Sequence, residues 1–431
     1  MEAEIHDGSS LTLPLIVEEK QHSLGSKVDD IESNYLPFSP GTTSSFMTIF
    51  NGINALSGVG ILSIPYALAS GGWLSLIMFL FIAIAAFYSG LLIKRCMDAD
   101  SNIRTYQDIG AHAFGNVGRV LVLIFMNAEL YLVITGFLIV EGDNLHNLFP
   151  HMEVEVAGMR IGGKQGFIIL VAVVILPTVW VDNLSLLSYI SASGVLASAI
   201  ILGSIFWTGA FDGVGFQQKG TLINWKGLPT AVSLYAFCFC AHPVFPTMYT
   251  SMKSRHQFSN VLFLCFTLCT ICYAAMAVLG YLMFGSDVQS QVTLNLPIEK
   301  FSSRLAIYTT LVNPIAKYAL MMTPVVDAIR PRLPYYCNKK PFSFLVSTAI
   351  LISTVIVALT VPFFGDLMSL VGAFLSMSAS IVIPCLCYLK ISGAYRRFQF
   401  ELVVILGVLV LAVVVGILGT YIAILQIVGN F

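Results

Sequence analysis

The sequence Asn54-Ala-Leu-Ser57-Gly58-Val-Gly60-Ile-Leu-Ser63-Ile-Pro65 interrupts a long apolar run, 46–69, near its middle. Pro65 has no backbone N–H, and its ring clashes with the carbonyl of Ile61, so this carbonyl loses its helical partner. Inside a bilayer, backbone groups without partners are tolerated only where they line a cavity or are buried in protein. The sequence therefore predicts a membrane-spanning helix that is broken at mid-depth, with polar backbone groups at the break.

A second apolar run, 227–250, carries a similar interruption, Phe237-Cys-Phe-Cys240-Ala-His242-Pro243-Val-Phe-Pro246. Pro246 lies 181 residues after Pro65 and five apolar runs later, and an odd number of spans per half inverts the second half relative to the first. Broken helices at corresponding positions of two inverted halves are typical of secondary transporters, whose substrate site lies near the bilayer midplane. The alternative is that both interruptions are ordinary proline kinks.

The composition of the 431-residue chain excludes a soluble protein. Apolar residues make up 57% of the chain and charged residues only 10%, against about 45–50% and about 25% in soluble proteins. The net charge is −1, so no strong field attracts nucleic acid. Many of the charges fall in the first 45 residues, and we interpret 1–45 as a disordered acidic cytosolic tail that is not a signal peptide.

Eleven apolar runs are long enough, at about 20 residues each, to cross the hydrocarbon layer as helices. They are continuous and do not alternate as the strands of a membrane barrel would. We predict an all-α integral membrane protein of eleven transmembrane helices, with a first five-helix repeat over 46–209, a second, inverted repeat over 227–390 and an extra eleventh helix over 399–428. The predicted spans are 46–69, 73–93, 118–140, 165–181, 186–209, 227–250, 258–284, 302–327, 342–364, 367–390 and 399–428.

The distribution of basic residues predicts the orientation. With the N-terminus in the cytosol, the cytosolic loops contain Lys94, Arg95, Arg104, Arg119, Lys253, Arg255, Arg330, Arg332, Lys339, Lys340, Lys390, Arg396 and Arg397. The opposite loops contain only Arg160, Lys164, Lys219, Lys226, Lys300 and Arg304. Because cytosolic loops are enriched in Lys and Arg, we predict a cytosolic N-terminus and a luminal C-terminus. The short run 165–181 is needed for this bias, which supports its interpretation as a span.

Two longer motifs resemble a known family. The segment Phe50-Asn-Gly-Ile-Asn54-Ala-Leu-Ser-Gly-Val-Gly60-Ile-Leu-Ser-Ile-Pro65-Tyr-Ala-Leu-Ala-Ser-Gly-Gly-Trp73 resembles the first-helix signature of the amino acid/auxin permease family, most closely its plant vacuolar amino-acid transporter branch. The segment Tyr235-Ala-Phe-Cys-Phe-Cys-Ala-His242-Pro-Val-Phe-Pro246-Thr-Met-Tyr-Thr-Ser-Met-Lys253 is similar to the sixth helix of that branch. The resemblance covers 46–428 in span number and loop lengths.

This resemblance implies a LeuT-like fold, with a five-plus-five inverted repeat, broken helices 1 and 6 and one extra helix. It also implies amino-acid transport coupled to a proton gradient across the vacuolar membrane. The wider family includes sodium-coupled members, so a sodium-coupled amino-acid importer at the plasma membrane is the alternative.

The two breaks offer partners for an amino-acid zwitterion. The N–H groups and the positive dipole end at the first break suit a carboxylate, and freed carbonyls at both breaks suit an ammonium. Phe237 and Phe239 either flank the substrate side chain or pack against lipid. Because neither break has an unpaired charged side chain, we expect small or medium neutral amino acids. The predicted substrate-binding residues are Asn54, Ser57, Gly58, Val59, Gly60, Ile61, Phe239 and Cys240.

Ionisable residues at membrane depth are rare and usually functional. Glu129 in the third run and Lys317 in the eighth either form a neutralising structural pair or take part in coupling. Pro314 frees a carbonyl near Lys317, whose ammonium could occupy the position between helices 1 and 8 that sodium fills in related transporters. His242 either exchanges a proton near neutral pH or is a satisfied core histidine.

In the tenth run, Ser369, Gly372, Ser376 and Ser380 recur at a spacing that places small residues on one helix face, which predicts close helix packing, with a gate as the alternative. A membrane-embedded enzyme is the main alternative from another class, but we find no paired acid–base motif at the end of a span. We therefore predict no catalytic residue, no cofactor and no bound metal. The predicted partners are neutral amino acids, protons and the lipid bilayer, and the predicted function is proton-coupled antiport by alternating access.

Overall fold

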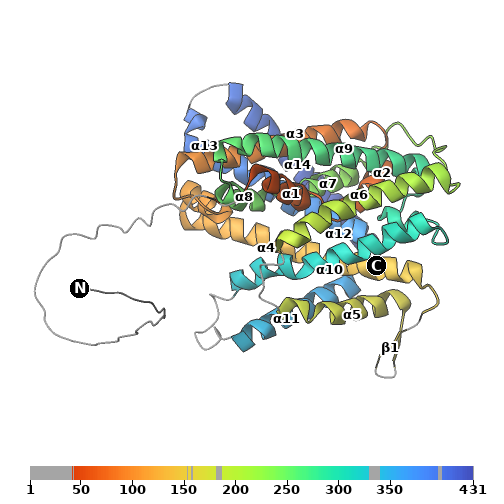
Figure 1. The fold of residues 1–431 in the computed structure, drawn as a ribbon. Coiled ribbons are helices and arrows are strands. Elements are labelled where there is room, and N and C mark those ends of the chain that lie inside the picture. The colour runs from red at the N-terminus through yellow and green to blue at the C-terminus, as the bar shows by residue number, and fades with distance from the viewer. Residues whose placement is uncertain are drawn as a thin grey trace, which may run out of the picture. The chain divides into compact units, whose positions relative to one another are not determined.

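A computed structural model describes residues 41, 43–152, 154–156, 159–180, 187–329, 340–396 and 400–430. The predicted tail 1–45 lies mostly outside these residues. The described chain is almost entirely helical (Figure 1). Its α-helices are α1 (Ser45–Leu56), α2 (Gly60–Gly71), α3 (Ser75–Ala99), α4 (Tyr106–Leu148), α5 (Gly163–Ile175), α6 (Leu187–Phe211), α7 (Leu228–Cys238), α8 (Phe245–Ser251), α9 (Phe258–Phe284), α10 (Phe301–Ile329), α11 (Lys340–Thr360), α12 (Phe364–Leu370), α13 (Ile383–Ser392) and α14 (Phe400–Gly429).

Shorter elements connect these helices. The 3₁₀ turns that bear on the site are η3 (His242–Val244) and η6 (Val292–Asn295). Between α12 and α13 the helix continues in π-helical form as η9 (Val371–Ser376) and η10 (Ser378–Val382). A two-stranded antiparallel hairpin, β1 (Val154–Val156) with β2 (Met159–Ile161), lies between α4 and α5.

The chain is a multi-pass membrane protein. Within the described residues, eight helices are long and apolar enough to cross a membrane, or nine if α1 and α2 form one bent span. The short predicted span 165–181 is among them, as Gly163–Trp180. Helix α10 is long but carries Pro314, Pro324 and Lys317, and the apolar part of α11, Phe344–Thr360, is short. These two helices coincide with predicted spans but are not among the eight helices that are long and apolar enough to cross a membrane.

Some predicted boundaries are wrong. Helix α4 extends in both directions beyond the predicted span 118–140, with non-helical dihedral angles at Phe114 and Gly115 where its first turns bend away. Its C-terminal extension contains Glu141, Asp143 and Asn144, polar residues that ended the apolar run in the sequence. They remain helical because neighbouring segments bury Glu141 and Asn144 and because Gln291 forms hydrogen bonds with Asp143 and Asn144. The β1–β2 hairpin was not predicted.

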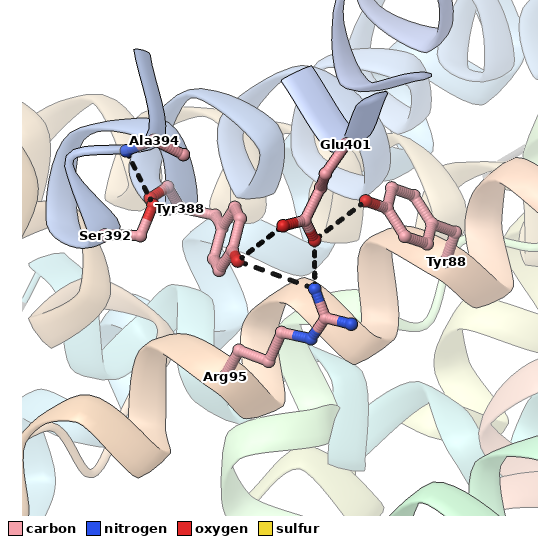
Figure 2. Close-up of polar contacts among 6 residues, drawn as sticks. All are labelled: Tyr88, Arg95, Tyr388, Ser392, Ala394 and Glu401. Carbon is pink, nitrogen blue, oxygen red and sulfur yellow. Dashed lines mark hydrogen bonds and ion pairs between the residues drawn. The ribbon is translucent and has the colours of Figure 1, made fainter. Parts of the chain in front are cut away.

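Helix α14 is largely lipid-facing, since only 22% of its most apolar 18-residue stretch is buried inside the protein. Its first turn is fixed to the bundle by polar contacts (Figure 2). The Glu401 carboxylate forms an ion pair with Arg95 of α3 and accepts hydrogen bonds from Tyr88 and Tyr388, at 3.3 Å each. Figure 2 shows this carboxylate between the two tyrosines, with the arginine reaching it from α3. The contact therefore joins α3, α13 and α14 at one end of the bundle.

The predicted close packing of the small-residue face is confirmed at Gly372. A Cβ atom built on Gly372 would lie 1.9 Å from the backbone oxygen of Ser233 in α7. Helix α7 packs against η9 and α2, so this glycine sets how closely two central elements approach. A backbone atom cannot move aside as the end of a flexible side chain can.

We predict that Gly372→Val lowers the thermal stability of the purified protein. Overpacking of a tight interior typically costs about 1–3 kcal/mol. Gly407→Val is the matched control, because a Cβ atom built on Gly407 meets no atom within 4 Å. Thermal unfolding in detergent should show a lower midpoint for Gly372→Val alone, and equal midpoints for both variants would contradict this account of the packing.

Candidate functional site

The first span is broken where the sequence predicted. Helix α1 ends at Leu56, α2 begins at Gly60, and their axes differ by 51°. Ser57 has a non-helical ψ of 75°, which turns the backbone away from the axis of α1. The amides of Ile61 and Leu62 bond back to Gly58 and Val59, at 3.4 and 3.1 Å. These short bonds begin α2 within the break, so the positive end of its dipole lies there.

The second span is broken between α7 and α8. Helix α7 ends at Cys238, and Phe239, Cys240 and Ala241 form the link to η3. Phe239 is buried and packs against Phe266 and Tyr273, with ring centroids 6.0 and 5.7 Å away. Of the two alternatives for Phe239, packing against lipid is therefore wrong, because its ring lies inside the protein.

The two breaks meet. Helix α2 packs against α7, and the Cys238 thiol donates to the Gly60 carbonyl at 3.5 Å. A Cβ atom built on Gly60 would lie 2.9 Å from the Cys238 sulfur. A Cβ atom on Gly58, two residues earlier, would meet no atom within 4 Å. Gly60 therefore permits the contact between the breaks, whereas Gly58 borders open space.

Lys317 projects from α10 to the first break. Its side chain is 3% exposed, and its ammonium donates to the backbone oxygens of Ser57 at 3.1 Å and Asn54 at 3.4 Å. A Cβ atom on Gly194 of α6 would come within 3.2 Å of the Lys317 nitrogen, so this glycine leaves room for the ammonium. The acceptors are thus one carbonyl of α1 and one of the break that follows it, and not the carbonyl of its own helix that Pro314 frees.

Glu129 has different partners. Its buried carboxylate accepts a hydrogen bond from Ser376 of η9 at 2.5 Å and another from the thiol of Cys240. Both Glu129 and Lys317 are described, and no ion pair joins them. The carboxylate therefore connects α4 to the second break, and the ammonium connects α10 to the first.

His242 is fully buried beside the second break. Its Nε2 atom lies 2.8 Å from the carbonyl oxygen of Ala86 and 2.7 Å from the hydroxyl of Ser89, both in α3. Since a carbonyl only accepts, Nε2 carries a proton and donates it to Ala86. Ser89 in turn donates to the carbonyl of Ser380 in η10, at 2.6 Å. His242 thus lies in a hydrogen-bonded network that joins three elements.

Glu141 was missed by the sequence analysis. It is 1% exposed and lies in the part of α4 beyond the predicted end of the span. A carboxylate next to an apolar run can equally be a residue of the following loop. The one sequence signal for a longer helix was the continuation of apolar residues at Leu145 and Leu148.

Comparison with known proteins identifies the family. The profile of the family described as "Transmembrane amino acid transporter protein" matches residues 41–425. Amino acid transporter AVT1I of Arabidopsis thaliana is 61% identical over 391 residues, which cover 90% of this chain and 96% of that protein. Amino acid transporter AVT1J of the same plant is 61% identical over 408 residues, covering 94% and 96%. These matches confirm the resemblance found in the sequence.

Solved structures share the fold at low sequence identity. MhsT in complex with L-phenylalanine aligns with a TM-score of 0.51 and 12% identity, covering 88% of this chain and all of that one. Mhp1, a nucleobase-cation-symport-1 family transporter, aligns with a TM-score of 0.53 and 11% identity, covering 90% and 92%. The predicted LeuT-like fold is confirmed at this level. The chain is therefore an amino acid transporter and not an enzyme, and it belongs to the transmembrane amino acid transporter family.

Proposed function

We propose that this protein moves neutral amino acids across the vacuolar membrane by alternating access, in exchange for protons. The observation that carries the proposal is the Lys317 ammonium on the carbonyls of Asn54 and Ser57. A fixed positive charge at this position performs the electrostatic role of a bound cation, so the break of the first span needs no sodium ion. This observation favours proton coupling over a sodium-coupled importer at the plasma membrane.

In this proposal the substrate lies at the two breaks. Its carboxylate binds at the start of α2, near Ser57, Gly58, Val59 and Gly60, where the helix dipole favours negative charge. Its ammonium binds carbonyls near Ile61, Phe239 and Cys240. Because Lys317 already has carbonyl partners and Glu129 already has donors, neither offers a free charge to a cationic or anionic side chain. A neutral side chain fits this arrangement best.

We further propose that the chain crosses the membrane eleven times, with a cytosolic N-terminus and a luminal C-terminus, as the basic residues predict. The repeats are 46–209 and 227–390, related by inversion, and 399–428 is the extra helix. Each broken span is the first of its repeat, which brings the two breaks together at the centre. Glu129, His242 and Lys317 are the proposed coupling residues.

Purified protein in liposomes tests this function. We expect uptake of labelled neutral amino acids when a pH gradient is imposed, and no stimulation when sodium replaces potassium on either side. Exclusive transport of lysine and arginine, or of a solute that is not an amino acid, would refute the substrate class. Strict dependence on a sodium gradient would favour the plasma-membrane importer instead.

A further inference from the structure

Glu141 is a buried carboxyl group that the proposed coupling residues do not include. It lies on α4, three turns beyond Glu129, and is 1% exposed. Within the described part of the chain, neither of its carboxyl oxygens has a hydrogen-bond partner. A charged carboxylate without any partner in an apolar interior is strongly unfavourable. The group therefore needs a ligand of its own, which is either a proton or a cation.

The neighbouring cation is already engaged. Lys164 of α5 forms an ion pair with Asp143, at 2.5 Å, and its ammonium also donates to the carbonyl of Pro362 at 2.7 Å. Asp143 is two residues from Glu141, so it points to another side of α4. Glu141 is thus left without a counter-charge although a lysine lies close in the structure.

Several charged groups on elements packed against α4 have partners elsewhere. Lys317 donates to Ser57 and Asn54, Asp366 of α12 accepts from Asn430, and Arg304 of α10 donates to the carbonyl of Ile298. His242 of η3 donates to Ala86. Lys94 and Arg95 of α3 pair with Asp98 and Glu401. Residues 344–360 of α11, and η6, η9 and η10, contain no charged side chain.

A hydrogen-bonded chain leads from the surface toward Glu141. It begins at the Asp143–Lys164 pair, in which the lysine side chain is 30% exposed. Gln291 donates to Asp143 at 2.8 Å, and Asn144 donates to Gln291 at 2.7 Å. Asn144 lies one helical turn from Glu141, where side chains three residues apart are neighbours on the helix surface. These polar groups therefore extend from the Asp143–Lys164 pair to within one helical turn of the buried carboxyl, and no hydrogen bond joins them to it.

Two buried hydroxyl groups lie on the elements that enclose this region. Thr293 of η6 and Ser303 of α10 have no hydrogen-bond partner among the described residues. Helix α4 packs against both η6 and α10, and these two also pack against each other. The three elements thus contribute a carboxyl, an amide and two hydroxyls to one end of the bundle, which suits a site that binds and passes on a proton.

We propose that Glu141 is a proton-binding site of the transport cycle, loaded from the membrane face at which α4 ends and α5 begins. The step is the reversible addition of one proton to the carboxylate. This inference rests on the proposed proton coupling and adds a specific carrier to it. If the carboxyl were permanently neutral for structural reasons, Glu141→Gln would keep pH-driven accumulation, because the amide preserves the neutral form.

The test compares Glu141→Gln with wild type in liposomes. We expect pH-driven accumulation of a labelled neutral amino acid to fall at least about tenfold, within the range of typical coupling effects. The dependence of uptake on pH should flatten, whereas exchange of one amino acid for another at equal pH stays within about twofold of wild type. Glu299→Gln is the matched control, since Glu299 is an exposed residue outside the helices. It should behave as wild type.

The possible outcomes distinguish failure of the proposed proton coupling from failure of the Glu141 assignment. If wild type exchanges amino acids but ignores a pH gradient, the proposed proton coupling fails. If wild type responds to the gradient and Glu141→Gln responds equally, only the assignment of Glu141 is overturned. Sodium stimulation that disappears in Glu141→Gln would overturn it as well, by assigning the carboxyl to a metal cation. If Glu141→Gln does not fold, Glu141→Asp is tested instead. Because this variant retains a carboxyl group, we expect it to accumulate amino acid with a displaced pH midpoint. An unchanged midpoint would contradict the inference.

Discussion

Gly58→Val should abolish transport and strongly weaken amino-acid binding while the protein remains folded. A Cβ atom on Gly58 meets no atom within 4 Å, so the protein itself accommodates the larger side chain. If the substrate carboxylate occupies this space, the valine methyl groups exclude it. Overfilling a well-packed site costs about 1–3 kcal/mol, which corresponds to about 5- to 150-fold in affinity. Binding of a labelled neutral amino acid to purified protein measures this loss directly.

Two other glycines make the result specific. Gly203 of α6 also has no atom within 4 Å of a built Cβ and lies exposed on its helix, so Gly203→Val should bind substrate as wild type does. Gly60→Val should lose both binding and thermal stability, because its side chain would press on the sulfur and Cα atom of Cys238, at 2.9 and 3.3 Å. Normal binding by Gly58→Val would remove this break from the substrate site.

The breaks themselves could be predicted because proline and glycine act locally. Pro65 removes a helical hydrogen bond whatever the neighbours of the helix are, so the break can be recognised from the sequence alone. The structure places the first break at Ser57–Val59 and the second at Phe239–Ala241, within the segments predicted. The meeting of the breaks, by contrast, depends on the packing of α2 against α7, which no local pattern encodes.

The partners of the buried ionisable residues could not be predicted, because they depend on which helix face meets which neighbour. Glu129 and Lys317 each lie in one apolar run, and a direct pair is the simplest arrangement from sequence. In the structure, α10 presents Lys317 to α1, while α4 presents Glu129 to η9. The π-helical segments η9 and η10 were likewise not predicted.

The arrangement around Lys317 leads to the second large effect. A lone charge inside a span costs at least about 2.5–3.5 kcal/mol on insertion scales, so the carbonyls of Asn54 and Ser57 must compensate for its burial. The ammonium therefore stabilises the arrangement in which α10 lies against the break, and its loss should alter the equilibrium between states of the transporter.

We expect Lys317→Ala to insert and fold but to lose pH-driven accumulation at least about tenfold, while exchange of amino acids at equal pH survives. The exposed Lys300 provides the control variant Lys300→Ala. A structural ion pair would instead predict that Glu129→Gln and Lys317→Met restore each other's activity in the double variant. Because Glu129 bonds to Ser376 and Lys317 to α1, we expect no such rescue. Uptake by the two single variants and the double variant under a pH gradient distinguishes the structural pair from the coupling role. Full sodium-free accumulation by Lys317→Ala would reject the role of Lys317 in coupling.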